Sequence, residues 1–195
     1  MVKVGIIKVG IIVCAICAAA GVTVAGLGQD ISTRTKEAAA LAEQGKFVEA
    51  FGALNEAEAA IWDRMPLTIQ RALWVADSPT GFGLYAPRSD NVFDAGAPMH
   101  IYAEPMGFGW RKSGELWHVE LRADVVLRKR DGAELVRQPD FQKLAFASWV
   151  RNREFMTTFT YTFRDIPKGE YLVDTKLRDA VTGKAVTFSL PFVVR

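Results

Sequence analysis

The clearest pattern of hydrophobic and polar positions lies at the C-terminal end of the chain, residues 165–195. Every second residue from Tyr171 to Leu177 is apolar or threonine, and a second alternating run follows the turn at 179–184. A period of two is typical of strands that bury one face, so the two runs predict an antiparallel hairpin. Tyr171 follows a Pro-x-Gly bend. We therefore expect its ring to be buried and its hydroxyl to bond to the backbone of that bend.

The same alternation recurs between residues 91 and 163. It predicts strands near 91–93, at 99–104, 117–128, 134–136 and 144–150, and through the aromatic positions of 155–163. The run 117–128 is the longest, so we expect it to be a central strand. Short strands with turn residues between them are typical of an all-β sandwich. The pattern predicts such a sandwich over residues 91–195.

Upstream of the strands the spacing becomes helical. Between residues 32 and 61 apolar residues recur at intervals of three and four, and Gly45 separates two helices. Pro66 favours the start of a third short helix, from Leu67 to Val75. The sequence thus predicts a helical part at 29–76, a turn-rich linker at 77–90 and the sandwich after it. The large apolar side chains of the helices need a partner surface, which is the sandwich, each other or another protein.

The first 28 residues have the composition of a signal peptide. Lys3 and Lys8 precede an uncharged run from residue 9 to residue 29 that contains small residues suited to cleavage. A periplasmic or secreted location follows from this interpretation. About 20 apolar residues can also span a bilayer, so an uncleaved inner-membrane anchor is the alternative. Both cysteines, Cys14 and Cys17, lie in this leader, and a cleaved chain would have no disulfide and no thiolate.

Charge argues against a nucleic-acid partner. The formal net charge is +2, from 24 basic and 22 acidic residues. Two of the lysines belong to the leader, which leaves 24 − 2 = 22 basic residues against 22 acidic ones. A neutral chain lacks the basic surface with which proteins bind nucleic acid.

The two histidines are the first residues to consider for catalysis or metal binding. His100 and Glu104 project from one predicted strand, and His118 and Glu120 from another. If these strands are neighbours, two imidazoles and two carboxylates could form a metal site. The simpler interpretation is a pair of surface histidines. Because Gly-x-Ser-x-Gly is absent and 107–109 lacks the third glycine of a dinucleotide site, we predict no catalytic residues and no cofactor.

A glycine-rich loop at 105–114 is the best candidate for binding. It contains Phe108, Trp110 and Arg111, and a second segment contributes Arg151 and Arg153. Aromatic residues with arginine are typical of interface hot spots, and loops on a rigid scaffold commonly carry recognition. In the alternative interpretation, the two aromatic rings fold back and cap one end of the sandwich. The arginines then belong to a solvated bend.

Residues 91–195, with their spaced strands and the tyrosine after the bend, resemble immunoglobulin-like and fibronectin-III-like domains, without the disulfide of antibody domains. The run 41–50 resembles the turn and second helix of one tetratricopeptide repeat. The whole chain, α+β overall, is similar to uncharacterised bacterial exported or periplasmic proteins of this build. The resemblance implies a location but no activity.

From these features together we expect a non-enzymatic interaction or scaffolding module that binds another envelope protein through the sandwich loops or the helical hairpin. A metal-binding or enzymatic accessory protein that uses His100 and His118 is one alternative. A membrane-anchored structural component of the envelope is the other.

Overall fold

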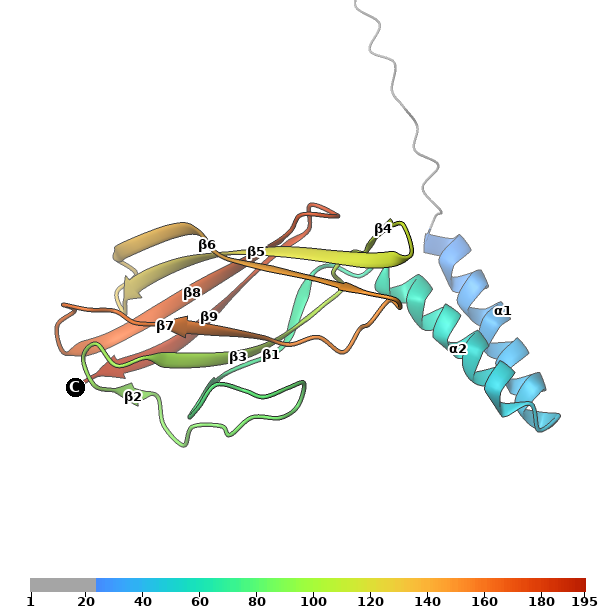
Figure 1. Ribbon diagram of the computed structural model, residues 1–195, viewed down its shortest axis with the longest axis horizontal. Helices are drawn as coiled ribbons and strands as arrows, with labels where there is room; N and C mark the ends of the chain where they lie inside the picture. Colours follow the sequence, from blue (N-terminus) through green and yellow to red (C-terminus); the bar gives the residue numbers. More distant parts are fainter. Residues whose placement is uncertain (1–23) are drawn as a thin grey trace, which may run out of the picture. The chain divides into compact units, whose positions relative to one another are not determined.

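The computed structural model describes residues 24–195, so most of the predicted leader lies outside the described residues. The chain divides into two compact units, of which the first ends at Ala57 and the second runs from Glu58 to Arg195. The described part contains two helices and several sheets, with more residues in strands than in helices, and is therefore an α+β protein (Figure 1).

The first unit is a pair of helices. Helix α1 (Val24–Glu43) is followed by a short turn and by α2 (Phe47–Trp62). Gly45 stands in this turn at a φ of 76°, a left-handed conformation that glycine adopts without strain, and its amide bonds to the carbonyl of Ala42. The two predicted helices and the break at Gly45 are confirmed. The last turn of α2 extends into the second unit.

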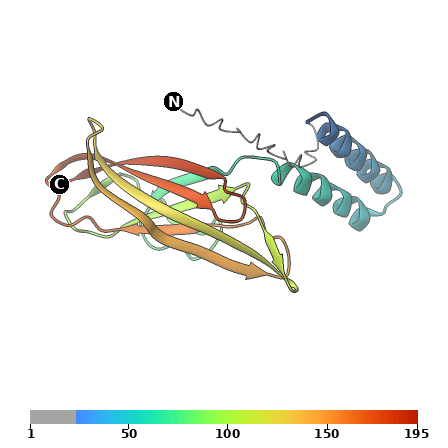
Figure 2. The same ribbon diagram turned by 90° about the horizontal axis from the view of Figure 1, so that it is seen from above.

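Apart from the last turn of α2, the regular secondary structure of the second unit consists of strands. They are β1 (Thr68–Val75), β2 (Val92–Phe93), β3 (Met99–Met106), β4 (Arg111–Ser113), β5 (Leu116–Lys129), β6 (Glu134–Ser148), β7 (Thr157–Tyr161), β8 (Gly169–Asp179) and β9 (Ala185–Val194). One sheet has the order β1-β3-β7, and the other has the order β2-β9-β8-β5-β4, with β6 also paired to β5. All pairs are antiparallel except β2 with β9. The views in Figures 1 and 2 show the two sheets as two layers.

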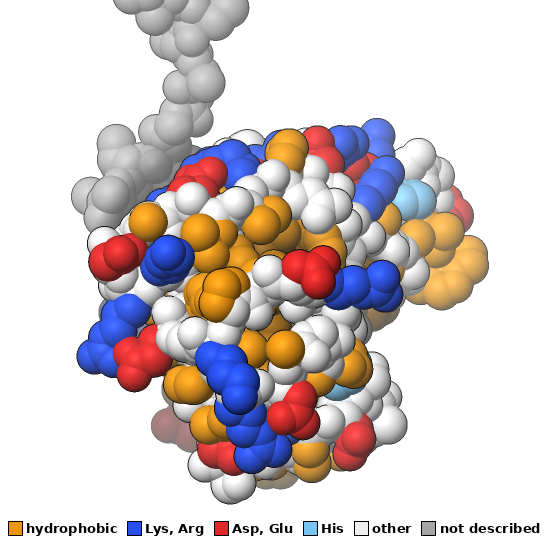
Figure 3. All heavy atoms as spheres, turned by 90° about the vertical axis from the view of Figure 1, so that its left-hand side faces the viewer, with side chains coloured by type: hydrophobic (Ala, Val, Ile, Leu, Met, Phe, Trp, Pro, Cys, Tyr) orange, Lys and Arg blue, Asp and Glu red, His pale blue; other side chains and the backbone are white. Residues whose placement is uncertain are grey.

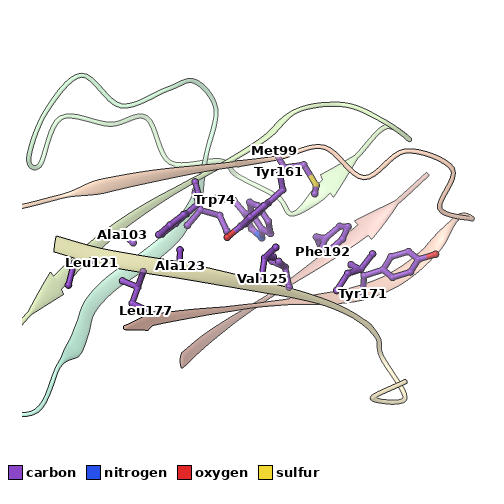
Figure 4. Packing of buried hydrophobic residues seen from close by; sticks show 14 of the residues in the cluster. Trp74, Met99, Ala103, Leu121, Ala123, Val125, Tyr161, Tyr171, Leu177 and Phe192 are labelled. Carbon is purple, nitrogen blue, oxygen red and sulfur yellow. The ribbon is translucent and has the colours of Figure 1, made fainter. Parts of the chain in front are cut away.

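A single hydrophobic core lies between the sheets. Ala103 and Tyr161 from the three-stranded sheet and Leu121, Leu177 and Phe192 from the other point toward one another in Figure 4, and all five are buried. On β8, every second residue from Tyr171 to Leu177 is buried, as the alternation predicted. The apolar face of this hairpin therefore forms one wall of the core.

Tyr171 confirms the predicted corner. Its ring is 4% exposed, and its hydroxyl donates a hydrogen bond of 2.6 Å to the carbonyl of Pro167, within the preceding bend. One side chain thus joins the bend to the beginning of strand β8.

The predicted third helix is wrong, because residues 68–75 form strand β1 on the edge of the smaller sheet. A bulge between Ile69 and Arg71 interrupts the pairing of β1 with β3. The bulge adds a residue and breaks the period of two, so the apolar spacing in the sequence looks helical.

The predicted linker at 77–90 is part of the second unit and returns along β1. The amide of Ala76 bonds to the carbonyl of Ala86, and the amide of Arg88 bonds to Trp74. Tyr85 stacks on Tyr102 of β3, with ring centroids 4.2 Å apart. The segment therefore covers the outer face of the three-stranded sheet, and the boundary between the units lies earlier, after Ala57.

Strand β6 also differs from expectation, since the two strands predicted at 134–136 and 144–150 are one continuous strand that ends at Ser148. Its pairing with β5 shifts between Ala123 and Val125, opposite Pro139 and Asp140, and Asp140 has a φ of 48°. Proline is tolerated in a strand at such a bulge. The Pro-Asp pair therefore interrupts the alternation without ending the strand.

Candidate functional site

The loop between β3 and β4 covers one end of the core. Phe108 is 1% exposed, and its ring meets Trp62 edge-on with centroids 5.2 Å apart and Trp110 at 5.1 Å. Phe155 packs on the same ring at 5.6 Å. Since Phe108 is buried on all these sides, it cannot contact a partner. The structure favours the second interpretation of this loop, a cap on the core.

Three successive residues of this loop are held by backbone hydrogen bonds to distant side chains. Lys184 donates from Nζ to the carbonyl of Gly107 at 3.0 Å, and Trp62 donates from Nε1 to the carbonyl of Phe108 at 2.8 Å. The amide of Gly109 donates to Oδ2 of the buried Asp179 at 2.7 Å. A buried carboxylate needs such donors to offset its lost hydration. The conformation of the loop is therefore fixed by the fold.

The two predicted arginines of the 149–156 segment are also engaged within the second unit. Arg151 forms an ion pair with Asp63, and its guanidinium lies 4.5 Å from the centre of the Trp110 ring. Arg153 pairs with Glu58 at 2.8 Å. Cation–π contacts and ion pairs of this kind hold local geometry. Both arginines thus tie the β-rich unit to the last turn of α2 and the residue after it.

Trp62 is the centre of this junction. Its side chain is 4% exposed, and Trp110 lies 5.4 Å away in a tilted arrangement. Lys184 donates to the carbonyl of Asp63 at 3.3 Å, just past the end of α2, where a cation is favourable because the last carbonyls of a helix are unsatisfied. Four of the predicted binding residues, Phe108, Trp110, Arg151 and Arg153, therefore build an anchor for the end of α2.

The surface that remains open at this end is centred on Trp149. Trp149 is 74% exposed and Val150 is 65% exposed, directly after β6 ends. In the neighbouring strands Lys112, Trp117 and Ser148 stand in register across β4, β5 and β6. Arg111 and Lys112 of β4 are both exposed. We call Trp149, Val150, Arg111 and Lys112 the Trp149 surface.

Trp149 was not among the predicted binding residues, although the burial pattern of β6 contains a signal for it. In the second half of β6, Leu144, Phe146 and Ser148 are half-buried, while the residues between them are exposed. Continuing this alternation places position 149 on the solvent side. A tryptophan on the polar side of a strand is unusual, and Trp149 stands two residues before Arg151, the first of the two arginines predicted to bind.

The structure does not bring the four candidate metal ligands together. His100 lies in β3 of the three-stranded sheet and bonds to Thr160 at 3.0 Å, whereas His118 lies in β5 of the other sheet. Glu120, next to His118 on the polar face, is paired with Arg122 and Lys143. No group of three potential ligands that could hold a metal occurs in the described residues.

Glu104, the remaining candidate, belongs to a buried polar group under the 77–90 segment. Its Oε1 accepts a hydrogen bond of 2.6 Å from the hydroxyl of Tyr102, which accepts in turn from the amide of Gly83 at 2.8 Å. Burial and the bond to Glu104 raise the pKa of Tyr102 to about 12. A neutral tyrosine that is satisfied on both sides fastens the covering segment to β3.

The opposite end of the second unit, with the β5–β6 turn and the C-terminus, shows mixed charge. Acidic and basic side chains intermingle there around scattered apolar ones (Figure 3). Arg130 forms an ion pair with Glu170, for example. Opposite charges in contact leave no field of one sign to attract a charged ligand. The Trp149 surface is therefore the better candidate for binding.

No protein-family model matches the chain, and no curated protein matches its sequence. Among solved structures, it is similar to the PKD domain of an M14-like peptidase from a Thermoplasmatales archaeon, at 12% identity over 67% of this chain and 96% of that one, with a TM-score of 0.32. It is also similar to the alkylpurine DNA glycosylase AlkC of Pseudomonas fluorescens bound to DNA, at 10% identity over 78% of this chain and a TM-score of 0.37. The sporulation control protein Spo0M of Bacillus subtilis gives 12% identity over 67% and a TM-score of 0.31.

The chain spans 39% of the glycosylase and 50% of Spo0M. TM-scores of 0.31 to 0.37 do not establish a shared fold. The description of the fold therefore rests on the strands and contacts of this chain itself.

Proposed function

We propose that the chain is a non-enzymatic interaction module whose β-rich unit has an immunoglobulin-like fold. The strand order supports this fold. In immunoglobulin-like domains the tyrosine corner stands near the start of a strand that lies between two others in its sheet. Here Tyr171 is at the start of β8, which lies between β5 and β9.

The observation that carries the proposed function is the exposure of Trp149. The chain has five tryptophans, and Trp62, Trp74, Trp110 and Trp117 are buried or half-buried. Trp149 is 74% exposed and has exposed Val150 beside it. Tryptophan and arginine are the residues most enriched in interface hot spots. An exposed tryptophan at the rigid end of a sheet is thus suited to insertion into a partner.

The chemistry of the surface indicates the chemistry of the partner. Trp149 and Val150 require an apolar pocket, while Arg111 and Lys112 are exposed cations on β4, which is separated from the end of β6 by strand β5. An apolar pocket with an acidic rim would match both features. We infer a protein partner of this kind, and the envelope is the compartment in which we expect it.

The envelope location in this proposal is supported by the sequence of the leader, in which Lys3 and Lys8 precede the uncharged run. No helix in the described residues is both long and apolar enough to cross a membrane. The mass of the protein recovered from cells tests the location. Cleavage between about Ala20 and Gln29 is expected. Recovery of the intact N-terminus on membranes would indicate the anchored structural component instead.

The binding proposal is tested by placing a photo-crosslinking amino acid at position 149 of the full-length protein in its native cells. We expect an adduct with one protein, which mass spectrometry then identifies. The matched control is position 133, an exposed alanine in the β5–β6 turn at the other end of the unit. Equal labelling from both positions, or none from position 149, would contradict the proposed surface.

A substitution then measures the contribution of the tryptophan. Trp149→Ala is expected to weaken binding to the identified partner by at least about 30-fold, the effect of a hot spot of about 2 kcal/mol. Because the side chain is exposed, the urea midpoint should change little. A wild-type affinity in this variant would exclude Trp149 as the hot spot.

A further inference from the structure

A cleft lies in the larger sheet where two strands share the same edge of β5. Strand β4 pairs with β5 as far as His118, and β8 pairs with β5 from Leu121 onward. Because β6 occupies the other edge of β5 over this whole range, β4 and β8 lie on one edge. The turn after β8 reaches Glu120, through the amide of Ala180, and Val119 is left without a neighbouring strand on that edge. A cleft of about 370 Å³ is found at this gap.

The polar side chains of the cleft come from the face of the sheet that is turned away from the core. Along β5, His118 and Glu120 are half-buried, whereas the alternate residues are buried. Arg111 of β4 stands directly opposite His118, so both side chains project from this same face. Lys143 of β6 is exposed and completes the charged part of the lining. Two cations and a histidine thus surround the cleft, with one carboxylate among them.

That carboxylate, Glu120, is already neutralised. Lys143 lies 3.2 Å from its Oε2, and Arg122 donates to its Oε1 from Nε at 3.1 Å and from Nη2 at 3.0 Å. The hydrogen bonds from Lys143 and Arg122 hold the pKa of Glu120 below its ordinary value. Two cations therefore act on one carboxylate, and positive charge is left over at the cleft before Arg111 is counted.

Arg111 is the donor that remains for a ligand. It is exposed, and no acidic side chain in residues 24–195 forms an ion pair with it. A guanidinium presents its N–H groups as a planar fork that matches the two oxygens of a carboxylate. His118 stands beside it and can add a donor from its ring.

The size and charge of the cleft indicate the class of ligand. Small-molecule sites have volumes of about 300–1,000 Å³, and this cleft is near the lower end of that range. A phosphate would bring additional negative charge close to Glu120, so the lining favours a singly charged group. We propose that the cleft binds the carboxylate of a small molecule, with Arg111 forming paired hydrogen bonds to it and His118 donating beside it.

The chain has two histidines, so the NMR signals of their rings provide a local test. Acetate is added to the purified full-length protein at pH 7, with sodium chloride keeping the ionic strength constant. The His118 signal should move saturably, with half-saturation on the order of 10 mM. His100 is the internal control, because it lies in the other sheet and bonds to Thr160. Acetamide, which has nearly the same shape without the charge, should move neither signal.

Two substitutions of exposed arginines separate the cleft from general charge. Arg164 is exposed in the loop before β8, whereas the cleft lies beyond the other end of β8. Arg111→Gln should weaken acetate binding at least about tenfold, and the matched control Arg164→Gln should change it by less than about twofold, since a distant charge is screened.

The outcomes against the proposal are equally specific. An unmoved His118 signal, equal movement of both histidine signals, or equal weakening by the two substitutions would overturn it. If inorganic phosphate moves the His118 signal at a lower concentration than acetate does, the assignment to a carboxylate is wrong. The purified protein contains no partner, so the result does not depend on the Trp149 surface.

Discussion

Gly107 shows how one residue sets the path of the loop that covers Phe108. Its φ is 75°, and an added Cβ would collide with the carbonyl oxygen of Pro66. Gly96 has the same φ, but a Cβ there would meet nothing within 4 Å. We expect Gly96→Ala to cost about 1 kcal/mol, from backbone strain alone, and Gly107→Ala to cost about 2 kcal/mol more. Urea unfolding of the two variants measures the difference in their free energies of unfolding. Equal midpoints would show that the loop shifts to accommodate the added methyl group without cost.

Tyr171 is a second residue whose contribution can be isolated. Phenylalanine at this position keeps the ring in the core but leaves the carbonyl of Pro167 without its donor, so Tyr171→Phe should destabilise the protein by about 1 kcal/mol. Tyr85→Phe is a suitable comparison, because the Tyr85 hydroxyl bonds to the exposed Arg71 and its loss should cost less. Denaturation midpoints of the two variants show whether Tyr171→Phe is the more destabilising substitution. An unchanged midpoint for Tyr171→Phe would show that the corner adds no stability.

At the scale of elements, alternation was sufficient wherever the pairing is regular. Strands β5, β8 and β9 could be predicted because hydrophobic residues alternate with polar ones and one face of each strand is largely more buried than the other. Prediction from this alternation failed at bulges, because an extra residue there shifts the pattern of hydrophobic and polar positions. The bulge after Ile69 made β1 look helical, and the bulge at Pro139 made β6 look like two strands. A bulge is defined by its partner strand, which is far away in the chain, so the local sequence of one strand does not reveal the shift.

The β6 bulge is held by a charged cluster whose pH dependence follows from its geometry. Arg178 donates to Asp124 at 2.8 Å and to Asp140 at 2.7 Å, and its hydrogen bond to Asp124 lowers the pKa of that carboxyl. The folded state therefore holds this proton less tightly than the unfolded state. The stabilisation is present above the ordinary pKa of about 4 and is lost as the pH falls through the lower folded value.

The variant Asp124→Asn measures this effect. At pH 7 it should be less stable than the wild type by at most about 1 kcal/mol, because the cluster is partly open to solvent. The difference should shrink steadily below pH 4. Urea titrations between pH 2 and pH 7 provide the measurement. If the difference in free energy of unfolding between the wild type and the variant stays constant with pH, the Asp124 charge makes no contribution to stability.

At the scale of the whole molecule, the sequence could name the residues of the candidate site but could not assign their roles. Arg151 and Arg153 were recognised as unusual, yet their partners Asp63 and Glu58 lie 88 and 95 residues away. No local pattern reports such a distance. With these pairs formed, the residues that looked like a binding loop are an anchor. Among the tryptophans Trp149 is left exposed, so the proposed surface is adjacent to the predicted one.

The anchor leads to a prediction about how stability is distributed. The amides of Asp63 and Met65 bond to the carbonyls of Ala59 and Ile61 beside the buried Trp62, whereas α1 contacts α2 mainly through alanines. Local opening needs less free energy where little apolar surface is buried. Hydrogen exchange at Asp63 and Met65 should therefore be as slow as in β5 and at least tenfold slower than in α1.

Trp62→Ala should remove this protection. The substitution leaves a cavity beside Phe108 and a carbonyl without its donor, so exchange at residues 63–65 should accelerate to the rate seen in α1. Exchange in β8 serves as the internal control, because a core strand opens only when the whole unit unfolds. If β8 accelerates equally, Trp62 supports the entire β-rich unit. If residues 63–65 still exchange slowly in the Trp62→Ala variant, the contacts of Arg151, Arg153 and Lys184 are enough to hold the end of α2.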